Sequence, residues 1–133
     1  MQPSLGLTSK KRLAARSVRR RRHHQLAESA KAILATDPGA PHPLGKVAFA
    51  LGVSPSHLAH VFRAEAGVSL HRYLLQLRMA LAMTRLSRGP RDLSRLALDL
   101  GFANHSHFTS AFRSTYGVPP SGVRRLLGAR EAR

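Results

Sequence analysis

The sequence predicts an all-α fold with about seven helices. From residue 22 onward, apolar residues recur three and four positions apart, and no long stretch alternates apolar with polar residues. Glycine and proline divide the chain into segments of helical length. A chain of 133 residues, 43% of them hydrophobic, suits one domain or two small ones with a packed core.

Each predicted helix is bounded by a residue that breaks or caps it. Ser54 can cap a helix that has Pro55 in its first position, and Asn104 can cap a later one. The proline- and glycine-rich segment 37–43 (DPGAPHP) is expected to be a loop. In chain order, the apolar stripes and helices are expected at 26–34, 44–51, 54–67, 69–88, 93–100, 104–117 and 118–127.

The chain contains an internal repeat. The segment AFALGV beginning at Ala48 aligns with ALDLGF beginning at Ala97, at an offset of 49 residues. The segment LAHVFR beginning at Leu58 aligns with FTSAFR beginning at Phe108, at an offset of 50, so the second copy has one extra residue in its turn. Two copies are too few for a solenoid.

Each repeat has the features of a helix-turn-helix. Ala48 and Ala97 supply a small residue where two helices cross, and Gly52 and Gly101 supply a turn residue that tolerates positive φ. Val53 and Phe102 are expected to point inward. The second helix of each repeat buries one face and leaves the other free for a DNA major groove. The aromatic residues Phe62, Phe108 and Phe112 have inward helical spacing and are interpreted as core.

The charge predicts a polyanionic partner, because the net charge is +16. Residues 10–22 hold eight basic residues and no acid, and the remainder, with 14 basic and 6 acidic residues, is still basic. We expect residues 1–22 to be a disordered basic tail or linker, or a frayed helical extension. The run RRRR is either a solvated tail or an arm that binds phosphates without reading sequence.

Two stretches, GVSPSHLAHVFRAEAGVSLHRYLLQLRMALAMTRL and LSRLALDLGFANHSHFTSAFRSTYGVPPSGVRR, together resemble the DNA-binding domain of the AraC/XylS family of transcription regulators. The resemblance covers roughly residues 25–125. The motif G-F-x-x-x-S-x-F-x-x-x-F-[KR]-x-x-[FY]-G-x-x-P-[ST] is its most specific part. It is matched by Gly101, Phe102, Ser106, Phe108, Phe112, Arg113, Tyr116, Gly117, Pro120 and Ser121.

The resemblance implies two helix-turn-helix subdomains, at residues 23–68 and 89–127, joined by a long linker helix at 69–88, with a short tail at 128–133. A helix from Ser69 to Ser87 has 19 residues and spans about 28 Å at 1.5 Å per residue, close to the roughly 34 Å of one DNA turn. We therefore expect a monomer to place two recognition helices in successive major grooves of an asymmetric site.

Outward positions of the second helix of each repeat are the candidate base-reading residues. They carry mainly small or imidazole side chains. In the first repeat, the early positions of this helix hold no arginine, the residue that most often contacts guanine. The base-reading candidates are Ser56, Ala59, His60, Arg63, His105, Ser106, Thr109, Ser110 and Arg113. The phosphate-binding candidates are Lys46, Arg91, Arg95 and Arg124.

Other classes of function find little support in the sequence. There is no cysteine, no HExxH motif, no Walker A loop and no GxSxG elbow, so we expect no metal, no cofactor and no enzyme activity. There is no apolar run long enough for a membrane span, and the first residues lack the apolar stretch of a signal peptide, so we expect an intracellular protein. The resemblance implies a bacterial regulator, which we expect in the cytoplasm, at the nucleoid.

Three hypotheses follow for the function. The first is a sequence-specific transcription regulator, most plainly an activator that contacts double-stranded DNA and RNA polymerase. The second is a nonspecific basic nucleic-acid-binding protein, and the third is a protein-interaction module. Many family members carry a separate ligand-sensing domain, for which this chain has no room. The sequence leaves open whether the chain is a stand-alone regulator or the DNA-binding part of a longer protein.

Overall fold

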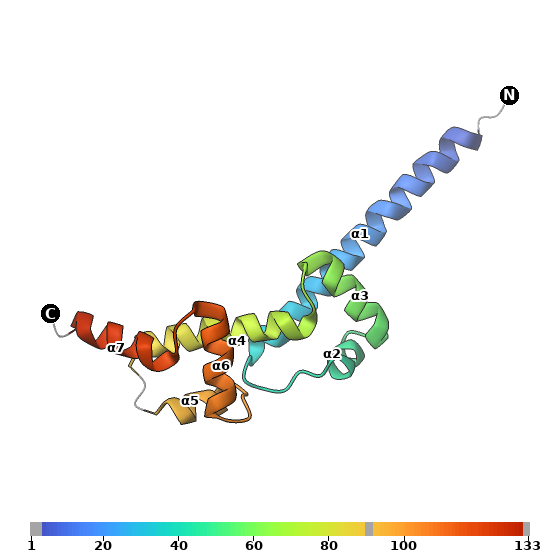
Figure 1. The fold of residues 1–133 in the computed structure, drawn as a ribbon. Coiled ribbons are helices and arrows are strands. Elements are labelled where there is room, and N and C mark those ends of the chain that lie inside the picture. The colour runs from blue at the N-terminus through green and yellow to red at the C-terminus, as the bar shows by residue number, and fades with distance from the viewer. Residues whose placement is uncertain (1–3, 90–91, 132–133) are drawn as a thin grey trace. The chain divides into compact units, whose positions relative to one another are not determined.

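The computed structural model describes residues 4–89 and 92–131, and the side chains of residues 8–89 and 92–127 (Figure 1). The all-α prediction is confirmed, since these residues form seven helices and no strand. The helices are α1 (Ser4–Thr36), α2 (Leu44–Ala50), α3 (Pro55–Ala66), α4 (Leu70–Ser87), α5 (Leu93–Asp99), α6 (His105–Tyr116) and α7 (Pro120–Glu131). No helix in the described ranges is long and apolar enough to cross a membrane.

The helices form two compact units. Unit 1 comprises residues 1–33 and 43–70, and unit 2 comprises residues 34–42 and 71–133. Each unit contains one of the sequence repeats, α2 with α3 in unit 1 and α5 with α6 in unit 2. The helix expected as a linker, α4, falls almost wholly within unit 2.

The core of unit 1 is small. The crossing residue Ala48 of α2 is fully buried, and α2 packs against α3. The half-buried Val53 contributes less than its counterpart in unit 2. The buried residues of unit 1 are Ala27, Ala30, Val47, Ala48, Leu58, Val61, Phe62 and Leu70.

The core of unit 2 is larger and more aromatic. Phe102, Phe108 and Phe112 are buried, with ring centroids 5.3 Å apart for Phe102 and Phe108 and 5.9 Å apart for Phe108 and Phe112. Such tilted and edge-to-face pairs add stability beyond the burial of apolar area. The rings pack in one cluster with Met79, Ala82, Leu86, Leu93, Leu96, Ala97 and Leu100.

The loop after α1 is fastened to unit 2 by Arg78 of α4. Its Nε donates to the carbonyl of Pro38 at 2.7 Å and its Nη2 to that of Ala40 at 3.1 Å. Burial lowers the pKa of the Arg78 guanidinium from its ordinary value. These bonds join residues 34–42 to unit 2, whereas the predicted first subdomain, residues 23–68, contains them.

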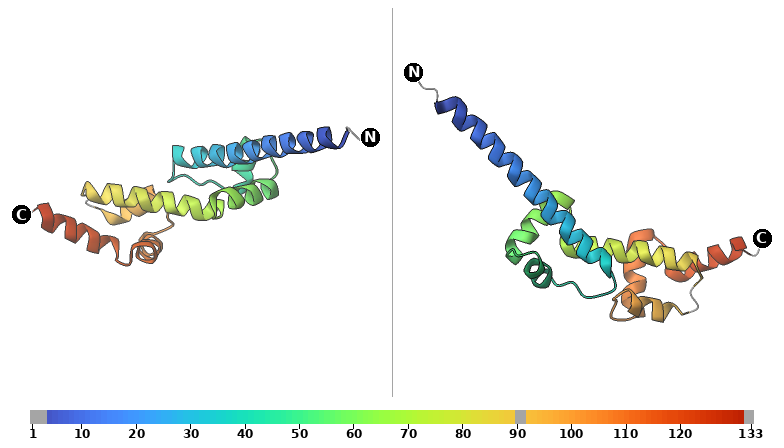
Figure 2. Two further views of the ribbon diagram at one scale, coloured as in Figure 1. Left: turned by 90° about the horizontal axis from the view of Figure 1, so that it is seen from above. Right: turned by 180° about the vertical axis from the view of Figure 1, so that it is seen from behind.

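Of the two alternatives for residues 1–22, a disordered tail and a helical extension, the structure has the helix, which begins at Ser4. Residues 7–36 contain no glycine or proline and are rich in Ala, Leu, Arg and Lys, which favour helix. All side chains from Thr8 to Arg22 are exposed. Both views of Figure 2 show the N-terminal part of α1 extending beyond α2 and α3, the other helices of its unit.

Candidate nucleic-acid interface

The two turns of the repeats have the same backbone geometry. Gly52 and Gly101 adopt φ of 71° and 87°, the left-handed region that glycine tolerates best. In each turn the next residue donates its N–H to the carbonyl of the crossing alanine, Val53 to Ala48 and Phe102 to Ala97, both at 3.0 Å. The predicted turn chemistry is therefore confirmed in both repeats.

Both candidate recognition helices are capped at each end. The Ser54 side chain accepts a hydrogen bond from the N–H of His57 at 3.1 Å, and the Asn104 side chain accepts one from the N–H of His107 at 2.8 Å. Both helices end at a left-handed glycine that donates to an arginine carbonyl four residues earlier. These caps fix α3 and α6 as short, well-defined helices of 12 residues each.

Burial separates an inward from an outward face on α3. Leu58, Val61 and Phe62 are buried, whereas Ser56, His60 and Arg63 are exposed and Ala59 is half-buried. The spacing of the outward residues places them on one side of the helix. The structure therefore brings the four base-reading candidates of α3 together on one accessible face.

The same separation holds on α6. Phe108 and Phe112 are buried, and the outward face is formed by exposed side chains together with the half-buried Thr109. This helix contains no acidic residue, so its outward face would not repel phosphate. The exposed candidates on that face are His105, Ser106, Ser110 and Arg113.

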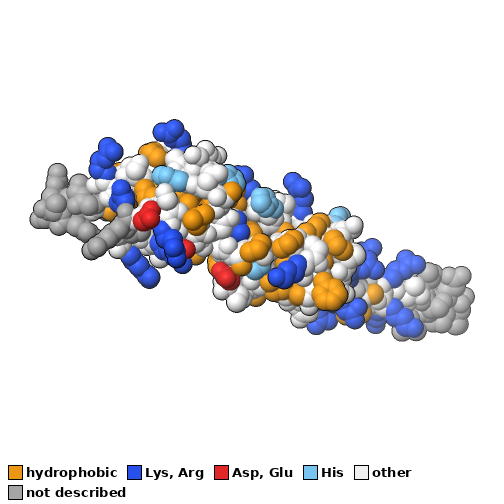
Figure 3. All heavy atoms as spheres, turned by 90° about the horizontal axis from the view of Figure 1, so that it is seen from below, with side chains coloured by type: hydrophobic (Ala, Val, Ile, Leu, Met, Phe, Trp, Pro, Cys, Tyr) orange, Lys and Arg blue, Asp and Glu red, His pale blue; other side chains and the backbone are white. Residues whose placement is uncertain are grey.

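The phosphate-binding candidates lie on several elements. Lys46 on α2, Arg95 on α5 and Arg124 on α7 are exposed. The Arg95 Nε lies 3.4 Å from a carboxylate oxygen of Asp99, so its charge is partly balanced. Arg91 lies outside the described residues. On the face drawn in Figure 3, Lys and Arg side chains are more plentiful than Asp and Glu.

One contact, between α1 and α3, was not predicted from the sequence. His57 and His107 occupy equivalent repeat positions, but their rings meet different partners. The His107 ring packs edge-on against Phe102, with centroids 5.4 Å apart. The smaller Val53 stands where Phe102 would be, and the His57 ring instead meets His23 of α1, with centroids 5.8 Å apart. The residues of α1 before Leu26 carry no apolar stripe, so no pattern in the sequence pointed to this contact.

The histidines form no candidate metal site. Within the described ranges, no group of three or more His, Cys, Asp or Glu residues is placed to hold a metal ion. His24 of α1 instead lies with its Nδ1 3.7 Å from a carboxylate oxygen of Glu65 on α3.

Two helix-turn-helix units on one chain, each presenting a capped helix with an open polar face, define a double helix-turn-helix domain. The family described as "Helix-turn-helix domain" matches residues 47–126, from α2 into α7. The chain belongs to this family and is of its AraC type.

Solved structures of this type share the fold. The AraC-type transcriptional regulator from Chromobacterium violaceum superimposes with a TM-score of 0.72 at 23% identity, over 77% of this chain and 92% of that one. The DNA-binding domain of the global transcriptional factor AdpA, solved in complex with a target DNA, superimposes with a TM-score of 0.73 at 21% identity, over 81% of this chain and 96% of that one.

Curated relatives match at higher identity over part of their length. The transcriptional activator RhrA of Rhizobium meliloti is 39% identical over 85 residues, which are 62% of this chain and 27% of the relative. This chain spans between 27% and 30% of the length of the first curated relatives that it matches.

Proposed function

We propose that this chain is a sequence-specific DNA-binding transcription regulator that reads its target with α3 and α6. The observation that carries the proposal is the pair of capped helices, each with one buried apolar face and one open polar face. The family membership and the AdpA domain solved on target DNA support the same function. The proposal requires no catalytic step, metal or cofactor.

The two recognition faces have different chemistry, which favours an asymmetric target. On α3, His60 can donate to or accept from a base edge, and Ala59 can contact a thymine methyl group. On α6, Ser106, Thr109 and Ser110 offer hydroxyl groups that pair with either donors or acceptors. Two different helices in one chain can read two different blocks, so a monomer would suffice.

Exposed basic residues on α2, α5 and α7 supply sequence-independent affinity in this proposal. Lys46, Arg95 and Arg124 would contact phosphates and hold the recognition helices in register. The candidate Arg91 has the same proposed role. We place the protein at the bacterial nucleoid, where such contacts would be made.

Selection from a random duplex library by the purified chain tests this proposal. The salt concentration must be fixed near about 150 mM, because the affinity of each phosphate contact depends steeply on it. Enrichment of one asymmetric motif with two blocks about 10 base pairs apart is the expected result. Binding without any enriched motif would overturn the regulator proposal and leave a nonspecific nucleic-acid-binding protein.

We further propose that the regulator activates transcription by contacting RNA polymerase. The relative RhrA is named a transcriptional activator, which supports this direction. A promoter with the selected motif placed upstream should give more run-off transcript with the chain than without it. A decrease in transcript would indicate a repressor, and no change would contradict a contact with polymerase.

A further inference from the structure

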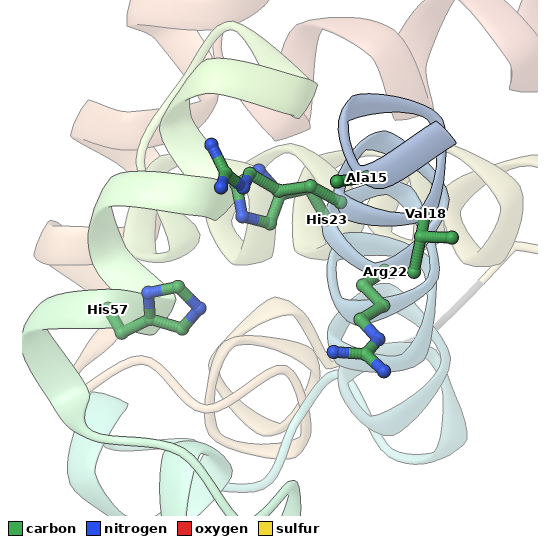
Figure 4. Close-up of a pocket in the computed structure, with 6 residues that line it drawn as sticks. Ala15, Val18, Arg22, His23 and His57 are labelled. Atoms are coloured by element: carbon green, nitrogen blue, oxygen red, sulfur yellow. The ribbon is translucent and has the colours of Figure 1, made fainter. Parts of the chain in front are cut away.

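A groove runs between α1 and α3 within unit 1. It has a volume of about 480 Å³ and is lined by Ala15, Val18, Arg19, Arg22, His23 and His57. Figure 4 shows Arg22 and His23 extending from α1, and His57 from α3, into the space between the two helices. A second hollow shares Arg22, His23 and His57 and continues toward the helix-turn-helix at Leu51 and Val53.

The groove-lining residues of α1 continue the face that packs on the core. Ala15, Arg19, Arg22 and Leu26 are spaced by four, three and four residues, which places them on one side of a helix. Leu26 is half-buried, and the buried Ala30 follows one turn later. The same side of α1 is therefore apolar against the core and basic beside α3.

The electrostatics of the groove favour an anion. Its lining contains two guanidinium groups and two imidazoles, and no acidic residue. Helix α1 contains no Asp or Glu before Glu28. Arg19 and Arg22 are exposed, so their charged groups are open to solvent and to a ligand.

The position of the groove relates it to the DNA that α3 would bind. His57 lines the groove, and His60, one turn further along α3, belongs to the base-reading face. When a helix occupies the major groove, the sugar-phosphate backbones rise on both sides of it. The backbone on the α1 side of helix α3 would therefore run along this groove.

We propose that Arg19, Arg22 and His57 form a phosphate-binding groove for the DNA strand that borders α3. The proposal rests on the proposed function, because it needs α3 to face DNA. It differs from a solvated basic arm, in which all eight basic residues between Lys10 and Arg22 would act equally through their charge. In the groove, the position of an arginine on the helix decides its effect.

Two double variants of the full chain separate these possibilities. Arg19→Ala/Arg22→Ala removes two charges that line the groove, and Arg20→Ala/Arg21→Ala removes two adjacent charges from other sides of α1. Both pairs replace exposed arginines with the best helix former, so neither change should disturb α1, and far-ultraviolet circular dichroism would check this.

The measurement is the affinity for a duplex carrying the selected motif, over a series of salt concentrations. For Arg19→Ala/Arg22→Ala we expect a loss of roughly ten-fold or more, and a salt slope reduced by about 2, since each phosphate contact contributes about 0.9. For Arg20→Ala/Arg21→Ala we expect a loss below about three-fold and a slope reduced by less than 1. Equal losses in the two double variants would overturn the groove.

Two further variants sharpen the result. Lysine binds phosphate as a point charge, so Arg19→Lys/Arg22→Lys should restore most of the salt slope. His57→Ala should weaken binding in the wild-type background and have less effect once Arg19 and Arg22 are gone. Additive losses would contradict a shared groove.

Failure of the groove and failure of the proposed function give different results. If the wild-type chain selects no motif, the proposed function fails. The groove is then tested by the same comparison of the two double variants on a random duplex. If the chain binds no duplex at all, both proposals fail. If a motif is selected and the double variants behave alike, only the groove is wrong.

Discussion

Replacement of Arg78 by alanine should detach the loop after α1 from unit 2. The substitution removes the hydrogen bonds to the carbonyls of Pro38 and Ala40, at 2.7 and 3.1 Å. Hydrogen bonds from a charged donor contribute about 1.5–3 kcal/mol each, and the two acceptors are half-buried, so water can replace part of the loss. We expect the free energy of unfolding to fall by about 2–4 kcal/mol.

The assay is equilibrium unfolding monitored by circular dichroism. Arg85→Ala, in the same helix, is the matched control. The Arg85 Nη1 lies 3.8 Å from an Asp99 carboxylate oxygen, and such an exposed pair contributes less than about 1 kcal/mol. For a chain of this size, the Arg78→Ala loss corresponds to a melting temperature lower by roughly 6–12 °C.

Hydrogen exchange would locate the effect. The N–H of Ala40 donates to the carbonyl of Asp37 at 3.1 Å, and its exchange should become faster in Arg78→Ala. If Arg78→Ala and Arg85→Ala have the same stability, the two hydrogen bonds do not hold the loop, and the reasoning is refuted.

Four further substitutions test local features of the structure by thermal unfolding. A Cβ at Gly39 would overlap the carbonyl oxygen of Asp99, so Gly39→Ala should lower the free energy of unfolding. A Cβ at Gly45 of α2 would meet nothing within 4 Å, so Gly45→Ala should raise the free energy of unfolding by about 0.5–1 kcal/mol. The reverse order would contradict the packing of the loop. Asn104→Ala should cost about 1 kcal/mol by removing the cap of α6, and an unchanged melting temperature would argue against that cap. Phe49→Ser should change the stability by less than about 0.5 kcal/mol, because the Phe49 side chain is 88% exposed, and a larger loss would show that it is packed.

The local features of the fold could be predicted from the sequence because they depend on short-range rules. The caps at Ser54 and Asn104 are fixed by residue type and by the helix that follows. The left-handed turns at Gly52 and Gly101 follow from the repeat, as does the burial of Ala48 and its counterpart. These features predict where the candidate recognition helices begin and end without any knowledge of tertiary contacts.

Contacts between distant segments could not be predicted in this way. The Arg78 bonds join residues 40 and 38 positions apart, and any of the surface arginines was an equal candidate for them. The residues of α1 before Leu26 lack an apolar stripe, so the sequence left open whether they form a disordered tail or a helical extension. His57 and His107 have different partners because the first repeat has Val53 where the second has Phe102. The His107 ring packs on Phe102, whereas the His57 ring meets His23.

The central claim is that α3 and α6 each read a separate part of one DNA site. The most direct test repeats the duplex selection with His60→Ala, which changes only the outward face of α3, and with Ser110→Ala, which changes only that of α6. The claim predicts that each variant relaxes the sequence preference in one block of the motif and leaves the other block unchanged. The loss of discrimination between bases in the affected block should be at most about 3 kcal/mol. Relaxation of the same block by both variants, or of neither block, would contradict it.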